Sequence, residues 1–223
     1  MKAVIFDLDG VLIKTEKLHF MLYGVTLQKF NLKLTKKDYN KFFSGKKTKE
    51  AFETYLRYKK KKINSKTITM LIRFFRKMKG NILSKKLKNY VKLREGTYQL
   101  LKRLKKKYKL ALATSTIKRF TDLIINGFEL RRYFDVVIYA ENVKKGKPCP
   151  KVYLKAAEKL KVDPKDCIVI EDSEAGIEAA KKAGMACIAI KDPELGKRKL
   201  SKADYIIKNF KEIDEKLIEK FQH

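Results

Sequence analysis

The chain has 223 residues, of which 44% are hydrophobic, as is ordinary for a globular protein with a substantial core. No apolar run approaches the roughly 18 residues that a membrane helix needs, and the short apolar start at residues 3–6 does not read as a signal peptide. The formal net charge is +30, from 55 basic and 25 acidic residues, which raises the question of a polyanionic partner.

The cysteines and histidines bear on the cell compartment and on the metal. Three cysteines, widely spaced and without a CxxC pair, are typical of reduced thiols, so we expect a cytoplasmic protein. Only two histidines are present, His19 and His223, which excludes a histidine-rich zinc site. Any metal would therefore be held by oxygen atoms, which favours Mg²⁺.

Short apolar segments along the chain predict buried strands that alternate with helices. This alternation predicts an α/β fold with a parallel sheet covered on both faces, in which ligands bind beyond the carboxyl ends of the strands. The predicted strands are Val4–Asp7, Leu110–Thr114, Val136–Tyr139, Ile168–Glu171, Ala186–Ile190 and Tyr205–Ile207. The predicted helices between them include Tyr98–Lys107, Val152–Leu160 and Glu174–Ala183.

Residues 14–92 interrupt the alternation, because they contain no convincing strand and carry apolar residues at roughly helical spacing. They predict a helical domain inserted after the first strand, with the core domain formed by residues 1–13 and 93–223. The predicted helices of the insertion are Leu18–Phe30, Lys37–Phe43, Lys49–Tyr58 and Ile68–Met78.

The first predicted strand ends in Asp7 and is followed by Asp9 and Gly10, a glycine that lets the chain turn sharply. A single carboxylate at this position could be a helix cap. Two carboxylates spaced by one residue point the same way if the chain stays extended, and like charges that close persist only with a cation or with unequal protonation. The pair therefore favours a magnesium site combined with acid–base chemistry.

Three further motifs lie at later strand ends. Residues 114–116, Thr-Ser-Thr, offer hydroxyls and free amides that suit a phosphate but equally an N-cap. Lys147, in the turn GKPCPKVY, could by itself be one more surface lysine. In IVIEDSEAGIEAAKKAGM, Glu171 and Asp172 end an apolar strand before a helix with a small-residue face, where acids could again be caps.

The order of these motifs, Asp-x-Asp, Ser/Thr, Lys and Glu-Asp, each at a strand end, resembles the haloacid dehalogenase superfamily. The pattern is nearest to the β-phosphoglucomutase-like group, which combines FDLDGV, a cap entry with Thr and His, KPxPxxY and EDSxxGxxAAxxAGM. In this chain they read FDLDGV, Thr15 with His19, KPCPKVY and EDSEAGIEAAKKAGM. The resemblance covers the whole chain and implies a Rossmann-like core with an inserted all-α cap domain.

The resemblance also implies phosphoryl transfer through an aspartyl-phosphate. Asp7 would be the nucleophile, and Asp9 would protonate the leaving oxygen and later deprotonate the attacking water. Lys147 would neutralise charge on Asp7 and on the transferring group. Mg²⁺ would be held by the Asp7 side chain, the Asp9 backbone carbonyl and Asp172, with Glu171 as a further member of the metal site.

The substrate implied by the resemblance is a small phosphorylated metabolite such as a sugar phosphate. Superfamily members that cleave carbon–halogen bonds or pump ions lack an aspartate at the position of Asp9, so its presence indicates a phosphatase or a phosphomutase. The residues predicted to bind substrate are Thr114, Ser115, Thr116, Lys118, Thr15, His19 and Gly45.

The cap residues favour a phosphatase over a mutase. The mutase-like pattern has a lysine just before the cap glycine and an arginine three residues after it, where this chain has Ser44 and Thr48 around Gly45. His19 agrees with a mutase, and similar cap entries occur in plain phosphatases. A β-phosphoglucomutase-type phosphomutase is therefore the alternative function. As for the oligomeric state, we expect a monomer.

The charge is unevenly distributed. Residues 14–92 carry 24 of the 55 basic residues but only 4 of the 25 acidic ones, a net charge of +20, which leaves +10 for the remainder. A protein that binds polyanions or nucleic acid on a retired enzyme fold is the rival from another functional class. We do not expect nucleic acid as a specific partner, because all the catalytic positions are intact and no nucleic-acid-binding motif is visible.

Overall fold

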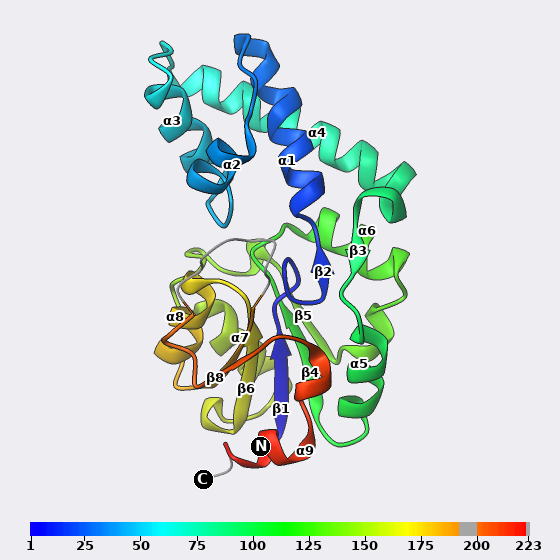
Figure 1. Cartoon of the computed structure of the whole chain (residues 1–223). Helices are drawn as coiled ribbons and strands as arrows, with labels where there is room; N and C mark the ends of the chain where they lie inside the picture. Colours follow the sequence, from blue (N-terminus) through cyan, green and yellow to red (C-terminus); the bar gives the residue numbers. More distant parts are fainter. Residues whose placement is uncertain (192–199, 222–223) are drawn as a thin grey trace. The chain divides into compact units, whose positions relative to one another are not determined.

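The computed structural model describes residues 1–191 and 200–221, and its contacts divide the chain into two compact units (Figure 1). One unit comprises Met1–Lys14 and Lys92–His223 and contains the large sheet, and the other, Thr15–Val91, is helical. Lys14 and Lys92 belong to the sheet unit, one residue beyond the expected boundary at each junction. No helix among the described residues combines the length and apolar character that crossing a bilayer requires.

The sheet unit is built on six parallel strands in the order β5-β4-β1-β6-β7-β8. Each strand that was predicted from an apolar run is present in the sheet. The predicted α/β fold class is therefore confirmed. The strands are β1 Ala3–Phe6, β4 Lys109–Ala113, β5 Val136–Ile138, β6 Cys167–Glu171, β7 Ala186–Ile190 and β8 Tyr205–Ile207.

The register of the three central strands aligns their carboxyl ends. Phe6 of β1 pairs with Leu112 of β4 on one side and with Ile170 of β6 on the other. The residues that come next in each chain segment, among them Asp7 and Glu171, therefore emerge at one edge of the sheet.

Helices cover both faces of this sheet (Figure 1). A core cluster on one face joins alternate strand residues such as Ile5 and Val169 to Tyr153 and Ala179 on the covering helices α7 and α8. Helix α5 packs against β4. The ring of Phe6 in β1 meets the ring of Phe134 edge-on. The helices of this unit are α5 Thr97–Lys105, α6 Lys118–Gly127, α7 Lys151–Leu160, α8 Glu174–Lys182 and α9 Glu215–Glu219.

A short antiparallel ladder joins the two places where the chain leaves and re-enters the sheet unit. Strand β2, Ile13–Lys14, pairs with β3, Lys92–Leu93. The sequence pattern does not predict this ladder, because two residues are too few to show an alternation of apolar and polar side chains.

The helical unit contains four α-helices, α1 Glu16–Leu27, α2 Lys36–Phe42, α3 Thr48–Tyr58 and α4 Ser65–Tyr90, among its residues 15–91. Its core is aromatic, since the ring of Tyr23 lies 4.5 Å from Phe43, 5.3 Å from Phe52 and 4.7 Å from Phe75 between centroids.

The last helix, α4, is much longer than the predicted helix Ile68–Met78. Its start is capped by Asn64, whose side chain accepts a hydrogen bond from the Thr67 amide. Lysines and a glycine interrupt the apolar pattern beyond residue 78, but Lys79, Gly80 and Leu83 are buried in the structure. The prediction ended too early because helical packing here buries residues that are usually exposed.

Candidate active site

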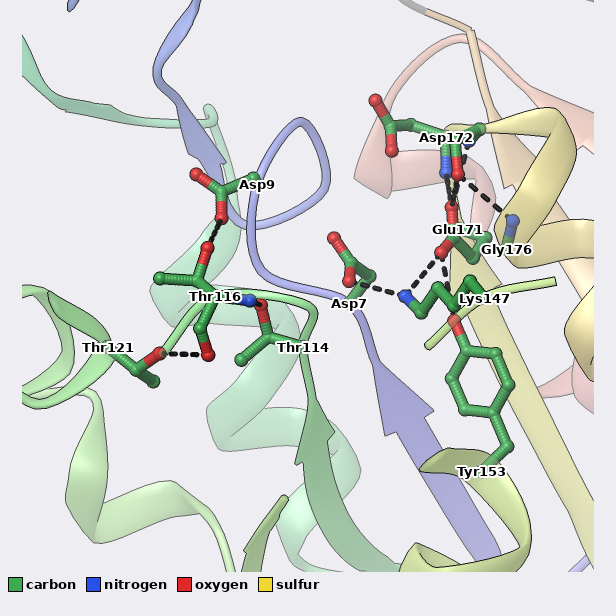
Figure 2. A network of polar contacts seen from close by, with 11 residues as sticks. Asp7, Asp9, Thr114, Thr116, Thr121, Lys147, Tyr153, Glu171, Asp172 and Gly176 are labelled. Atoms are coloured by element: carbon green, nitrogen blue, oxygen red, sulfur yellow. Dashed lines mark hydrogen bonds and ion pairs between the residues drawn. The ribbon is translucent and has the colours of Figure 1, made fainter. Parts of the chain in front are cut away.

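Residues from separate strand ends and one loop meet at the carboxyl edge of the sheet (Figure 2). Asp7 directly follows β1, and Thr114 directly follows β4. Glu171 ends β6, and Asp172 follows it. Lys147 comes from the loop between β5 and α7, so the predicted catalytic groups are brought together from distant parts of the sequence.

Lys147 lies between two carboxylates. Its Nζ is 2.6 Å from Asp7 Oδ1 and 2.6 Å from Glu171 Oε1, and all three side chains are buried. The hydroxyl of Tyr153 donates to the same Glu171 oxygen at 2.9 Å, and the Tyr153 ring centroid lies 4.8 Å from Lys147 Nζ. Glu171 and Tyr153 thus hold the ammonium group against Asp7.

Glu171 has a different role from the one expected of it. Its second oxygen, Oε2, accepts hydrogen bonds from the Asp172 amide, the Ser173 amide and the Ser173 hydroxyl, at 2.7, 2.8 and 2.9 Å. Because five donors occupy its two oxygens, Glu171 is an anchor for Lys147, and we withdraw it from the expected metal ligands. Gly176 permits this arrangement, since a Cβ there would stand 1.7 Å from Glu171 Oε1.

The two carboxylates that share the Lys147 ammonium differ in proton affinity. Burial raises the pKa of Asp7 to about 7, although Lys147 acts in the opposite direction. Burial also acts on Glu171, but there Lys147 and the amides of Ser173 and Asp172 prevail and hold its pKa below the usual value. Lys147 stays protonated because the two carboxylates raise its pKa despite burial.

Asp9 is held by the residues that follow β4. The Thr116 hydroxyl donates to Asp9 Oδ2 at 2.7 Å, while the Thr116 amide donates to the Thr114 hydroxyl oxygen at 3.0 Å. Thr114 is buried and Ser115 is exposed. Thr116, expected to bind substrate, therefore contacts the expected acid–base group directly.

The side chains at this edge supply oxygen donors of the type that Mg²⁺ prefers. Asp172 approaches the turn after Asp9 so closely that a Cβ on Gly10 would be 2.0 Å from Asp172 Oδ2. Among the described residues, no three His, Cys, Asp or Glu side chains form a metal-binding group. The remaining expected ligands, the carboxylates of Asp7 and Asp172 and the Asp9 carbonyl, are the hard oxygen donors that Mg²⁺ takes while retaining several waters.

Lys118 does not point its charge toward this cluster. Its ammonium group is paired with Asp122 and lies 5.2 Å from the ring centroid of Tyr139. Its amide donates to both oxygens of Glu141, at 2.9 and 3.1 Å. The expectation that Lys118 binds substrate is therefore not supported, because an (i, i+4) ion pair on the surface of α6 engages its side chain.

The expected cap residues lie in the helical unit. Thr15 is buried just before α1, and Gly45 has a left-handed φ of +71° in the turn after α2. His19 Nε2 lies 3.1 Å from the Nζ of the buried Lys79. Sequence reasoning missed Lys79, since one lysine among many shows no sign of burial, and it left Tyr153 without a role although KPCPKVY contains it.

A family model described as haloacid dehalogenase-like hydrolase matches residues 4–190. The chain belongs to this family. The resemblance read from the motifs is therefore confirmed.

Two relatives are similar over most of their length. A phosphorylated carbohydrates phosphatase of Thermotoga maritima is 34% identical over 186 residues, which cover 83% of this chain and 82% of that protein. A beta-phosphoglucomutase of Bacillus subtilis is 34% identical over 194 residues, covering 85% and 83%. The crystal structure of a haloacid dehalogenase-like hydrolase of Entamoeba histolytica is 28% identical, covers 99% of both chains and has a TM-score of 0.85.

These similarities settle the general class of activity. The chain is an enzyme, a phosphatase of the haloacid dehalogenase-like family.

Proposed function

We propose that this enzyme is a magnesium-dependent phosphatase of a small phosphorylated metabolite, such as a sugar phosphate, and that it acts through an aspartyl-phosphate on Asp7. The observation that carries the proposal is the buried contact of 2.6 Å between Lys147 Nζ and Asp7 Oδ1. This contact places a positive charge beside the carboxylate that is to attack phosphorus. We include in the proposal the cytoplasmic location and the monomeric state expected from the sequence.

Asp7 attacks phosphorus in line, and the bond to the leaving oxygen breaks as the acyl phosphate forms. Attack of an anion on a phosphate requires counter-charge, and Lys147 supplies one fixed positive charge at Asp7 Oδ1. Thr114 and the Ser115 amide bind phosphate oxygens at the end of β4. Bound Mg²⁺ would add electrostatic stabilisation of the transferring group, held by Asp7, Asp172 and the Asp9 carbonyl.

Asp9 moves protons in both halves of the reaction. It donates a proton to the leaving alkoxide in the first half and accepts one from water that attacks the acyl phosphate in the second. The Thr116 hydroxyl donates to Asp9 Oδ2, and this hydrogen bond directs the carboxyl group.

A phosphomutase is the second candidate. The similarity to the Bacillus subtilis beta-phosphoglucomutase and the presence of His19 favour it. A mutase must hold a bisphosphate at both ends, and the chain offers Ser44 and Thr48 where the mutase-like pattern has cations. Lys118 is also engaged by Asp122. We therefore place the phosphatase first.

The first prediction tests the nucleophile. Asp7→Asn should reduce phosphate release to below about 1% of the wild-type rate, because the nearly isosteric amide cannot form an acyl phosphate. The control is Asp163→Asn, an exposed capping position where asparagine also caps. Release of inorganic phosphate is measured with Mg²⁺ on a panel of phosphorylated metabolites.

One substrate in that panel separates the two candidates. With β-glucose 1-phosphate, a phosphatase yields inorganic phosphate and a mutase yields glucose 6-phosphate. Retention of more than about 5% activity by Asp7→Asn would refute the nucleophile assignment. Binding of nucleic acid by a protein without any phosphatase activity would instead support the polyanion-binding rival.

A further inference from the structure

The turn that follows the Asp7–Asp9 pair presents three consecutive backbone carbonyls to another segment. Within the turn, Gly10 has a left-handed φ of +87°, its amide donates to Ile13 O at 2.8 Å, and the Leu12 amide donates to Leu8 O at 3.0 Å. These bonds leave the carbonyls of residues 10, 11 and 12 to accept from elsewhere. Buried carbonyls of this kind require donors.

One short segment, Arg94–Thr97, supplies all of those donors. Arg94 Nη2 donates to Gly10 O at 2.6 Å, and Arg94 Nε donates to Val11 O at 2.9 Å. The Arg94 amide donates to Leu12 O at 2.9 Å, and the Thr97 hydroxyl lies between Leu12 O at 3.2 Å and Arg94 O at 2.7 Å. Arg94 is only 7% exposed, so its guanidinium is part of the interior of the turn and does not lie on the surface.

We propose that Arg94 is a positioning residue that sets the place of Asp9, the acid–base group, by fixing the backbone of the turn directly after it. Asp9 then has two supports. Thr116 holds its carboxyl oxygen, and Arg94 holds the peptide groups that follow it. The inference rests on the proposed phosphatase mechanism for its kinetic consequences but not for its structural ones.

The geometry requires arginine at this position. Its planar fork presents Nε and Nη2 to two successive carbonyls at once, whereas lysine has a single nitrogen at the end of a flexible chain. Arg94→Lys therefore keeps the positive charge and loses the fixed pair of hydrogen bonds. This makes the lysine variant a probe of geometry instead of charge.

The kinetic test compares two leaving groups. Alkyl phosphates need protonation by Asp9, and aryl phosphates need little. Arg94→Lys should lower kcat/KM for an alkyl phosphate by roughly 10- to 100-fold, a part of the 10²–10⁴-fold that a positioned general acid contributes, and for p-nitrophenyl phosphate by less than about 3-fold. Equal losses on the two substrates, or no loss, would overturn the inference.

A double-mutant cycle tests whether Arg94 acts through Asp9. In an Asp9→Asn background, Arg94→Lys should cause little further loss with the alkyl phosphate, because the group it positions has been disabled. Additive losses would mean that Arg94 acts on something else. The matched control is Arg103→Lys, an arginine of α5 that donates to the carbonyl of Ile213, and it should leave both substrates unaffected.

Hydrogen exchange provides a readout that does not require activity. In Arg94→Lys, the amides of Gly10, Leu12 and Ile13 should exchange faster, while the strand amides of β1 keep their wild-type protection. Unchanged exchange in the turn would overturn the inference even if the wild-type enzyme released no phosphate. Absence of phosphate release by the wild type would instead reject the proposed function, so the two failures are distinguishable.

Discussion

Lys147 makes two buried ion pairs of equal length, to Asp7 and to Glu171, and yet the two carboxylates differ in proton affinity. Against burial, Lys147 lowers the pKa of Glu171 most, and the backbone amides of Ser173 and Asp172 on its other oxygen lower it further. Asp7 is buried with fewer such donors, and its pKa rises to about 7. Glu171 therefore gives up its proton more readily than Asp7, and additional positive charge near Asp7 would favour its ionised form.

This difference leads to a prediction about pH. A proton on Asp7 removes the nucleophile, so kcat/KM should fall as pH drops through the pKa of Asp7. A bound cation favours the ionised carboxylate, so this acid limb should move to lower pH as the Mg²⁺ concentration rises. The measurement is the pH profile of kcat/KM for an aryl phosphate at several Mg²⁺ concentrations. An acid limb that stays fixed would contradict it.

Tyr153 offers a second prediction. Tyr153→Phe removes the hydroxyl that donates to Glu171 and keeps the ring beside Lys147, so kcat should fall and unfolding should become easier by about 1 kcal/mol. Tyr98→Phe also removes a tyrosine hydrogen bond, to the carbonyl of Phe128, at a more exposed position outside the active-site cluster. Denaturant unfolding and phosphate release are compared for both. A kcat loss shared by Tyr98→Phe would argue against a specific role for Tyr153.

Helix α8 shows how a secondary-structure element shapes the site. As the N-cap, the Ser173 side chain accepts a hydrogen bond from the Gly176 amide, and its hydroxyl also donates to Glu171. The first turn of the helix therefore lies against the carboxylate that anchors Lys147. Because a Cβ at Gly176 would stand 1.7 Å from Glu171 Oε1, glycine is what permits so close an approach. Glycine is a poor helix former, but at this position it leaves room for the Glu171 side chain.

Two glycine-to-alanine substitutions in helices should therefore have opposite effects. Gly24 lies inside α1 with no atom within 4 Å of an added Cβ, so Gly24→Ala should stabilise the protein by about 0.4–1 kcal/mol. Gly176→Ala should destabilise it and lower kcat by displacing Glu171 from Lys147. Thermal unfolding and phosphate release measure both effects. A Gly176→Ala enzyme with wild-type kcat would contradict the role given to Glu171.

Across the chain, charge follows the division into units. The segment 14–92, nearly the same as the helical unit, carries +20 of the total +30, and three of its four acids are engaged within the unit. Glu16 accepts a hydrogen bond from Tyr39, Asp38 accepts one from Tyr55 and pairs with Lys59, and Glu53 pairs with Lys49. The helical unit is therefore a strongly positive body, suited to attracting anionic substrates over long distances.

Such attraction should weaken with salt. Raising salt from about 0.05 to about 0.5 M should lower kcat/KM steeply and leave kcat nearly unchanged, because the Debye length shortens from roughly 14 to roughly 4 Å. Replacing Lys60, Lys61 and Lys62 with glutamine should flatten this dependence more than replacing Lys208, Lys211 and Lys216 of the sheet unit. A kcat/KM that does not change with salt, with Mg²⁺ saturating, would remove any role for this charge.

The local sequence pattern was enough to predict those features that depend on residues close together in the chain. Apolar runs ending in Asp7, Thr114 and Glu171 predicted the strands and their common edge, since a parallel sheet collects the carboxyl ends of its strands. The family followed from the motifs along the chain, and the same motifs supply the proposed catalytic residues. Helical periodicity also predicted most of the inserted unit, but it failed in α4, where Lys79 is buried.

Tertiary structure alone decided which side chains touch. Lys147 and Asp7 are 140 residues apart, and Arg94 and Gly10 are 84 apart, so no spacing in the sequence records either contact. The sequence alone could not show that both carboxylate oxygens of Glu171 accept hydrogen bonds, or that the Lys118 ammonium group pairs with Asp122. The physical reason is that hydrogen bonds of a few ångströms depend on how separate elements pack, whereas periodicity reports only which face of one element is buried.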